Sequence, residues 1–152
     1  ISDPRALGSP YHGRMESHYP AVRTLAVRSY SSPHVLQYYT RSSAMVKGCL
    51  SRFRRMFEDS DDEWVAGLDV EYTIVLGSEK KLKEAEKKKP AVIQVCMHDL
   101  CLVYHICHAD VKCEEFKNFL KGSLVKFVTI DFTNDKEVLG RIGLIVGNPF
   151  DL

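Results

Sequence analysis

Apolar residues come in short blocks separated by polar turns, a pattern typical of a domain that mixes helices and strands. Two β-branched and aromatic stretches, 21–30 and 34–40, flank Ser31-Ser32-Pro33, which predicts two short strands joined by a turn. Residues 44–57 then place an apolar side chain every three or four positions. This spacing predicts an amphipathic helix, with Ser43 suited to cap it.

The middle of the chain has the character of strands. Residues 64–72 form an apolar stretch interrupted by Asp69 and Glu71, which predicts a buried strand with two acidic positions. Residues 91–97 and 101–107 flank a short polar link and predict a hairpin. Between these blocks, residues 79–89 carry six lysines and three glutamates without an apolar stripe. We expect a solvated loop or frayed helix there rather than a nucleic-acid contact.

The last third alternates helix and strand. We expect a short helix over 113–121 that stops at Gly122, a strand over 124–132, a helix that begins at Asn134 or Asp135, and a strand at 144–146. The complete order predicts an α/β fold in which an antiparallel meander joins parallel strands and helices cover the sheet. The ribonuclease H-like mixed sheet is built in this way.

The amino-acid composition limits the class of protein but does not indicate a particular function. With 152 residues, 45% hydrophobic and 27% charged, the chain suits one folded domain, which we expect over 20–152 behind a flexible arm at 1–19. No apolar run is long enough to span a membrane, and the first residues do not resemble a signal peptide. Five cysteines leave at least one thiol unpaired. These features favour an intracellular protein, nuclear or cytoplasmic, in a reducing compartment.

Charge is distributed unevenly along the chain. Residues 1–57 hold nine lysines and arginines against Asp3 and Glu16, a net charge of +7, whereas residues 58–152 hold 12 basic and 18 acidic residues, a net charge of −6. A basic flank beside an acidic body suits a protein that holds a polyanion and binds divalent cations, although solvated surface charge gives the same balance.

Asp69 and Glu71 are the first candidates for chemistry. Residues two apart on a strand point to the same face, and two carboxylates in an apolar strand repel each other unless cations compensate them. Mg²⁺ prefers oxygen ligands, and Asp135, which enters the predicted helix after strand 124–132, could be a third. The alternative is that Asp69 and Glu71 line a solvated strand edge and that Asp135 caps a helix.

Three blocks of sequence resemble the DEDD 3′–5′ exonuclease family, most closely the plant Werner syndrome-type exonuclease domains. They are the stretches at 64–72, 91–96 and 127–139. The resemblance implies a ribonuclease H-like fold over roughly residues 20–152, two Mg²⁺ or Mn²⁺ ions, and hydrolysis of the 3′-terminal phosphodiester of a nucleic acid. It implies that Asp69 and Glu71 are the metal-binding carboxylates of the first motif and that Asp135 is the aspartate of the second.

The sequence departs from this family in its third motif. That motif, a Tyr or His followed four residues later by an aspartate, has no match before the chain ends at Leu152, and Thr129 and Asp131 replace small or apolar residues. We therefore expect weak metal binding and little turnover. Two functions remain: an impaired 3′–5′ exonuclease-like domain that binds nucleic acid, or an inactive exonuclease-like module, within a larger protein, that binds a protein partner through an exposed strand edge such as 124–132.

Cysteines and histidines are dense between residues 96 and 113. The set comprises Cys96, His98, Cys101, His105, Cys107, His108 and Cys113. No C-x-x-C pair occurs, and the cysteines stand in apolar surroundings, so buried free cysteines are favoured over zinc or a Cys-His nucleophile.

Overall fold

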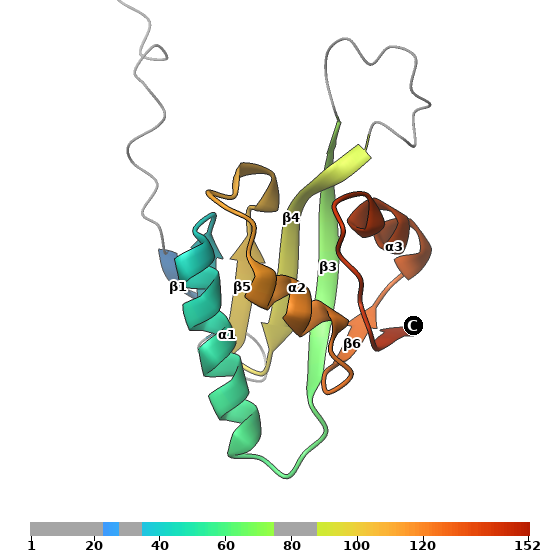
Figure 1. The fold of residues 1–152 in the computed structure, drawn as a ribbon. Coiled ribbons are helices and arrows are strands. Elements are labelled where there is room, and N and C mark those ends of the chain that lie inside the picture. The colour runs from blue at the N-terminus through green and yellow to red at the C-terminus, as the bar shows by residue number, and fades with distance from the viewer. Residues whose placement is uncertain (1–22, 28–34, 75–87) are drawn as a thin grey trace, which may run out of the picture.

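The computed structural model describes residues 23–27, 35–74 and 88–152, and of 23–27 only the backbone. A seven-stranded mixed sheet with the order β1-β2-β5-β4-β3-β6-β7 forms its centre (Figure 1). The strands are β1 (Arg23–Val27), β2 (Val35–Thr40), β3 (Val65–Ile74), β4 (Lys88–Met97), β5 (Leu100–Tyr104), β6 (Lys126–Thr129) and β7 (Pro149–Asp151). The helices are α1 (Ser43–Glu58), α2 (Glu114–Lys121) and α3 (Phe132–Arg141), with a short 3₁₀ turn at Ile106–His108.

The connections between strands confirm the predicted fold class. β3, β4 and β5 form an antiparallel meander, α2 then leads to β6, which lies parallel to β3, and α3 leads to β7, which lies parallel to β6. This arrangement is the mixed sheet of the ribonuclease H-like fold. The hairpin of β1 and β2 is added at the other edge, where β2 lies parallel to β5.

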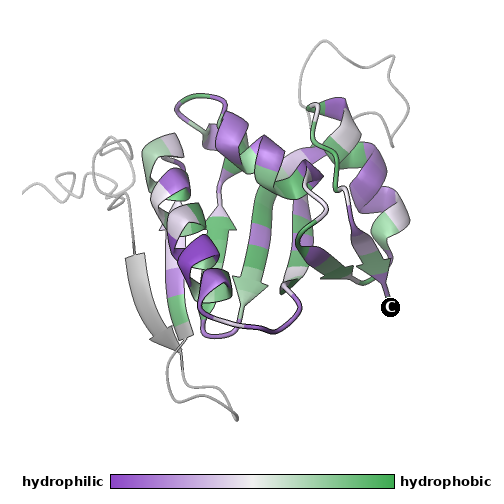
Figure 2. Cartoon of the chain, turned by 60° about the horizontal axis from the view of Figure 1, so that its bottom comes forward, coloured by the Kyte–Doolittle hydropathy of each residue, from purple (hydrophilic) through white to green (hydrophobic). Residues whose placement is uncertain are grey.

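Helices cover one face of the sheet. α1 and α2 lie in front of the strands in Figure 1, and the hydrophobic parts of the strands lie beneath the helices in Figure 2. Along β3, Ala66, Leu68 and Val70 are buried under the helices, whereas the residues between them, Asp69 among them, are exposed. We call the side of the sheet that carries Asp69 the open face.

Aromatic rings join the helices to the sheet. Phe53 of α1 stacks on Phe119 of α2 with ring centroids 6.1 Å apart, and Phe119 meets the edge of Phe127 of β6 at 5.5 Å. Such ring pairs add to the large apolar area that each side chain buries. This ring cluster of Phe53, Phe119 and Phe127 holds α1, α2 and β6 together. Because α3 follows β6 directly in the chain, the cluster also helps to fix where α3 begins.

Several element boundaries differ from the predictions. α1 is capped by Ser42, whose side chain accepts a hydrogen bond from Met45 N; Ser43 is its buried first residue. The strand predicted over 124–132 is shorter, because β6 covers only Lys126–Thr129. The strand predicted at 144–146 is absent, and the final strand is β7 at Pro149–Asp151. The predicted arm at 1–19 and most of the lysine run at 79–89 lie outside the described residues, while its last two lysines begin β4.

The predicted open edge at 124–132 is wrong. β6 lies inside the sheet, because it pairs with β3 on one side and with β7 on the other. The sequence does not predict a strand at 149–151, because three residues are too few to show an alternating pattern. The edge strand at this end of the sheet is β7.

Candidate metal and nucleic-acid site

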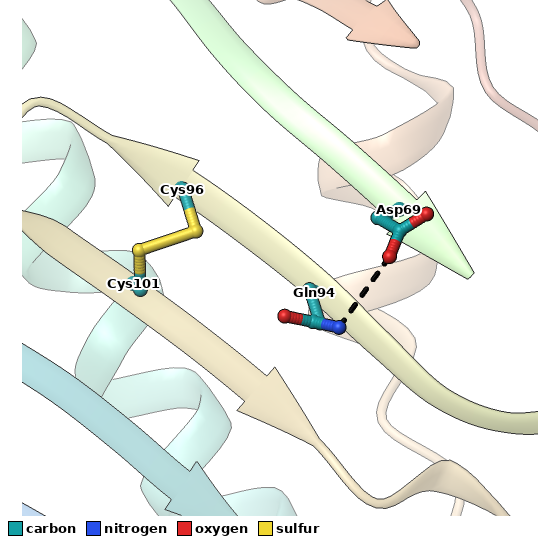
Figure 3. The surroundings of a disulfide bond; sticks show 4 residues. All are labelled: Asp69, Gln94, Cys96 and Cys101. Carbon is teal, nitrogen blue, oxygen red and sulfur yellow. Dashed lines mark hydrogen bonds between the residues drawn. A yellow bond between two sulfur atoms is a disulfide. The ribbon is translucent and has the colours of Figure 1, made fainter. Parts of the chain in front are cut away.

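Asp69 and Glu71 lie on the open face of β3, as their spacing predicts. Asp69 stands opposite Gln94 of β4, and Gln94 Nε2 donates a hydrogen bond to Asp69 Oδ2 at 3.4 Å (Figure 3). The neighbouring strand therefore helps to orient this carboxylate. No local pattern pointed to Gln94, because the residue opposite a strand position depends on register.

Tyr72 lies on the opposite face of β3 from Asp69 and Glu71. It is two residues beyond the buried Val70 and packs against the core, as alternation along a strand requires. Its hydroxyl donates a hydrogen bond to Asp135 Oδ1 in the first turn of α3. A register shift beside it leaves one extra residue, Ala91, on β4 between the partners of Glu71 and Tyr72. One strand therefore presents Asp69 to solvent and Tyr72 to Asp135.

Asp135 is a buried carboxylate among other acids. Its side chain is only 7% exposed. Burial raises the pKa of Asp135 above its usual range, and the negative charges of Asp69, Asp131 and Asp151 raise it further, while the Tyr72 hydrogen bond opposes the shift. The charges of Asp69 and Asp135 therefore act on each other. The alternative that Asp135 caps α3 is wrong, because the residue at the cap position is Asp131.

Asp151 fixes the start of α3. Its Oδ1 accepts hydrogen bonds from Thr129 Oγ1 at 3.2 Å and from the backbone N–H of Phe132 at 3.1 Å. A side chain from β7 thus satisfies a helix N-terminal N–H that the residue at the cap position leaves unpaired. Because this cap comes from 19 residues away, local sequence patterns could not reveal it.

A shallow groove of about 300 Å³ runs along the open face beside Asp69. Its walls come from β3, β4 and the end of β6, together with the C-terminal residue. Two side chains that line it, Ile130 and Leu152, are 77% and 76% exposed. The groove is therefore mainly apolar, with Asp69, Gln94 and Thr129 as its polar residues.

The donor atoms of this site suit Mg²⁺ or Mn²⁺, but the site lacks a full set of ligands. Asp69, Glu71 and Asp135 all offer hard oxygen ligands. Within residues 35–74 and 88–152, however, no three Asp, Glu, His or Cys side chains are grouped so as to hold a metal ion. The same finding removes support for a zinc site in the cysteine- and histidine-rich segment.

The prediction of free cysteines is wrong for one pair. Cys96 and Cys101 face each other across the hairpin of β4 and β5 and form a disulfide. Cys113 is buried and free as predicted, Cys107 is free but half-buried, and Cys49 of α1 is also buried and free. Apolar neighbours pointed to burial, but both Cys96 and Cys101 lie on the open face, where alternation along a strand could have placed them.

Replacing Asp135 by Asn should stabilise the fold. At neutral pH the buried charge opposes folding, and an amide can still accept the Tyr72 hydrogen bond, so we expect Asp135→Asn to raise the free energy of unfolding by about 0.5–2 kcal/mol. Because the folded-state pKa is raised, the wild type gains stability as the pH falls through that pKa, and the difference should shrink. Urea unfolding from pH 7 to pH 4 measures this; a less stable Asn variant at pH 7 would contradict it.

Comparison with known proteins places this geometry in a class. No family model and no curated protein sequence matches the chain. Among solved structures, RNase D from Trypanosoma brucei in complex with RNA matches with a TM-score of 0.54 and 13% identity over 76% of this chain and 37% of that one. The catalytic core of RRP6 from the same organism gives 0.61 and 10% over 88% and 32%. RNase D from Escherichia coli, an exoribonuclease, gives 0.54 and 14% over 78% and 27%.

These likenesses establish the fold. The chain shares the ribonuclease H-like architecture of these structures and spans about a third of their length. No helix in the described residues is long and apolar enough to cross a membrane.

Proposed function

We propose that this chain is a 3′–5′ exonuclease-like domain that binds nucleic acid 3′ ends and has an impaired phosphodiesterase site. The observation that supports it most is a fold shared with RNase D and RRP6 in which β3 carries Asp69 and Glu71 on its open face and holds Asp135 of α3 through the Tyr72 hydrogen bond. In this proposal Asp69, Glu71 and Asp135 are the site carboxylates. Among 3′–5′ exonuclease domains, we propose that the plant Werner syndrome-type domains are the ones this chain resembles most.

Impairment follows from the ligands that are present. Tyr72 engages one oxygen of Asp135, which is almost fully buried, and no third acid of the described residues joins Asp69 and Asp135 in a metal-ready group. Geometry decides how well a metal-dependent site works, since small displacements of the reacting groups cost large factors in rate. We therefore propose weak metal binding and slow turnover.

A basic helix provides a surface for phosphates. Arg52, Arg54 and Arg55 of α1 are exposed, and Arg52 also donates to the Tyr38 hydroxyl on β2. Arginine contacts to phosphates give nucleic-acid binding that does not depend on sequence and weakens with salt. RNA is the first substrate to test, because a matched RNase D was solved with RNA.

The test is degradation of 3′-labelled RNA, single-stranded DNA and recessed-end DNA with Mg²⁺ or Mn²⁺, alongside binding measured by fluorescence anisotropy. We expect binding to 3′ ends and slow metal-dependent shortening that is lost in the variant Asp69→Ala with Glu71→Ala. The matched control is Asp61→Ala with Asp62→Ala, which removes two exposed acids outside the site and should behave as the wild type.

Three results would change the assignment. Shortening that survives in the Asp69 and Glu71 variant would move the site elsewhere. Binding without any shortening would leave a nucleic-acid-binding domain without activity. Absence of binding would favour the second candidate, an inactive module that contacts a protein partner, for which the exposed apolar side chains Ile130 and Leu152 are the relevant observation.

A further inference from the structure

The Cys96–Cys101 disulfide lies beside the candidate site and has no part in it. Cys96 on β4 and Cys101 on β5 are register partners, so the bond joins neighbouring strands on the open face. Figure 3 shows it two residues along β4 from Gln94, which contacts Asp69. Both cysteines are half-buried.

Of the two cysteines, Cys96 is the one beside the groove. It lines the groove that also holds Asp69, whereas Cys101 does not line it. Its partner on β3 is Gly67, which has no side chain to cover the sulfur from that side. A small thiol entering the groove would therefore meet Cys96 Sγ first, and access decides which sulfur of a disulfide is attacked.

The hairpin does not depend on the bond. Backbone pairing runs from Ile93 opposite Tyr104 to Met97 opposite Leu100, and the turn residue Asp99 accepts a hydrogen bond from Leu36 N at 2.6 Å. The side chains of Met97 and Leu100 are buried on the helix side of the sheet. Strand pairing and burial therefore hold the two sulfurs together whether or not they are bonded.

We propose that Cys96 and Cys101 form a redox-modification site, a disulfide that small thiols such as glutathione open and close in the folded protein. In reduction, a thiolate attacks Cys96 Sγ, the sulfur–sulfur bond breaks, and Cys101 leaves as a thiolate that takes up a proton. A second thiolate attacks the small-molecule sulfur of the mixed disulfide on Cys96. Cys96 is released as a thiolate and is protonated; the two glutathione thiols have supplied two electrons to the cysteine pair and leave as one glutathione disulfide.

The test incubates the folded chain of 152 residues in glutathione buffers, applies a brief pulse of excess maleimide to the native protein at intervals, and maps the labelled cysteines by peptide mass spectrometry. Cys96 and Cys101 should become labelled together, roughly tenfold or more faster than Cys49. Cys49 is a suitable internal control because it is buried and burial raises its thiol pKa to about 12. Labelling of Cys49 in step with Cys96 would mean that reduction requires unfolding and would overturn the proposal, as would the absence of the disulfide from oxidised protein.

Two variants test the route through the groove. A Cβ on Gly67 would lie 3.8 Å from the Cys96 carbonyl oxygen, an ordinary contact, so Gly67→Val should fit and slow reduction roughly threefold or more by covering the sulfur. Cys101→Ser should accumulate a glutathione mixed disulfide on Cys96, while Cys107→Ser, which removes a half-buried thiol outside the pair, should reduce as the wild type does. An unchanged rate in Gly67→Val would overturn attack through the groove.

Discussion

Gly147→Ala should be among the most destabilising single substitutions in this chain, with a loss of about 3 kcal/mol or more in the free energy of unfolding. A Cβ at Gly147 would lie 2.7 Å from the carbonyl carbon of Lys121 and nearer still to its oxygen, with Gly122 O at 3.0 Å. These are backbone atoms at the end of α2 and cannot rotate away. Gly147 N also donates to Leu120 O at 2.8 Å, so the close approach is part of how the chain enters β7.

Matched glycines separate the effect of space from that of backbone freedom. Gly48 in α1 and Gly140 in α3 have nothing within 4 Å of an added Cβ. Alanine there should stabilise the helix by about 0.5–1 kcal/mol. Urea unfolding of the three variants measures the difference. If Gly147→Ala unfolds at the same urea concentration as the wild type, Gly147 does not pack closely against the end of α2.

The same segment links stability to the candidate site. β7 brings Asp151 to Thr129 and to the start of α3, and α3 carries Asp135. A shift of the chain at Gly147 therefore reaches Asp135 through Asp151. We infer that Gly147→Ala would disturb the candidate site as well as the fold.

Most of the fold could be predicted from local patterns because the helices and central strands bury one continuous face. The alternation in β3 and the three- and four-residue spacing in α1 both reflect burial against the same core. The end of the sheet could not be predicted in this way. β7 is only three residues long and all three are exposed, so its strand geometry depends on pairing with β6.

The sequence predicts the part of the candidate site whose residues are close together in the chain. It does not predict the contacts between residues that are far apart in the chain and meet only in the folded structure. Asp69 and Glu71 share a face because strands alternate. The contact of Asp69 with Gln94 depends on strand register, and that of Asp135 with Tyr72 depends on how α3 packs against β3. Neither leaves a local signature, and the Cys96–Cys101 pair depends on register in the same way.

Phe127→Ala should lower the free energy of unfolding by about 3–5 kcal/mol, the usual range for removing a buried phenylalanine ring. Phe127 is 0% exposed in the middle of β6, and its ring meets Phe119 of α2. Truncation leaves a cavity between the sheet and α2, which the paired strands on both sides of β6 cannot close. Because β6 leads directly into α3, we also expect Asp135 to lose its fixed position.

Phe150→Ala provides the matched control on the neighbouring strand. Phe150 pairs with Val128 of β6, is 50% exposed, and its ring lies 5.8 Å from Lys126 Nζ. Its loss should cost about 1 kcal/mol or less, since little apolar area leaves water and an exposed cation–π contact contributes little. Equal losses in the two variants would mean that β6 is not buried between α2 and the rest of the sheet. A large loss confined to Phe127 would confirm that the ring cluster of α1, α2 and β6 holds the strand from which α3 and Asp135 are positioned.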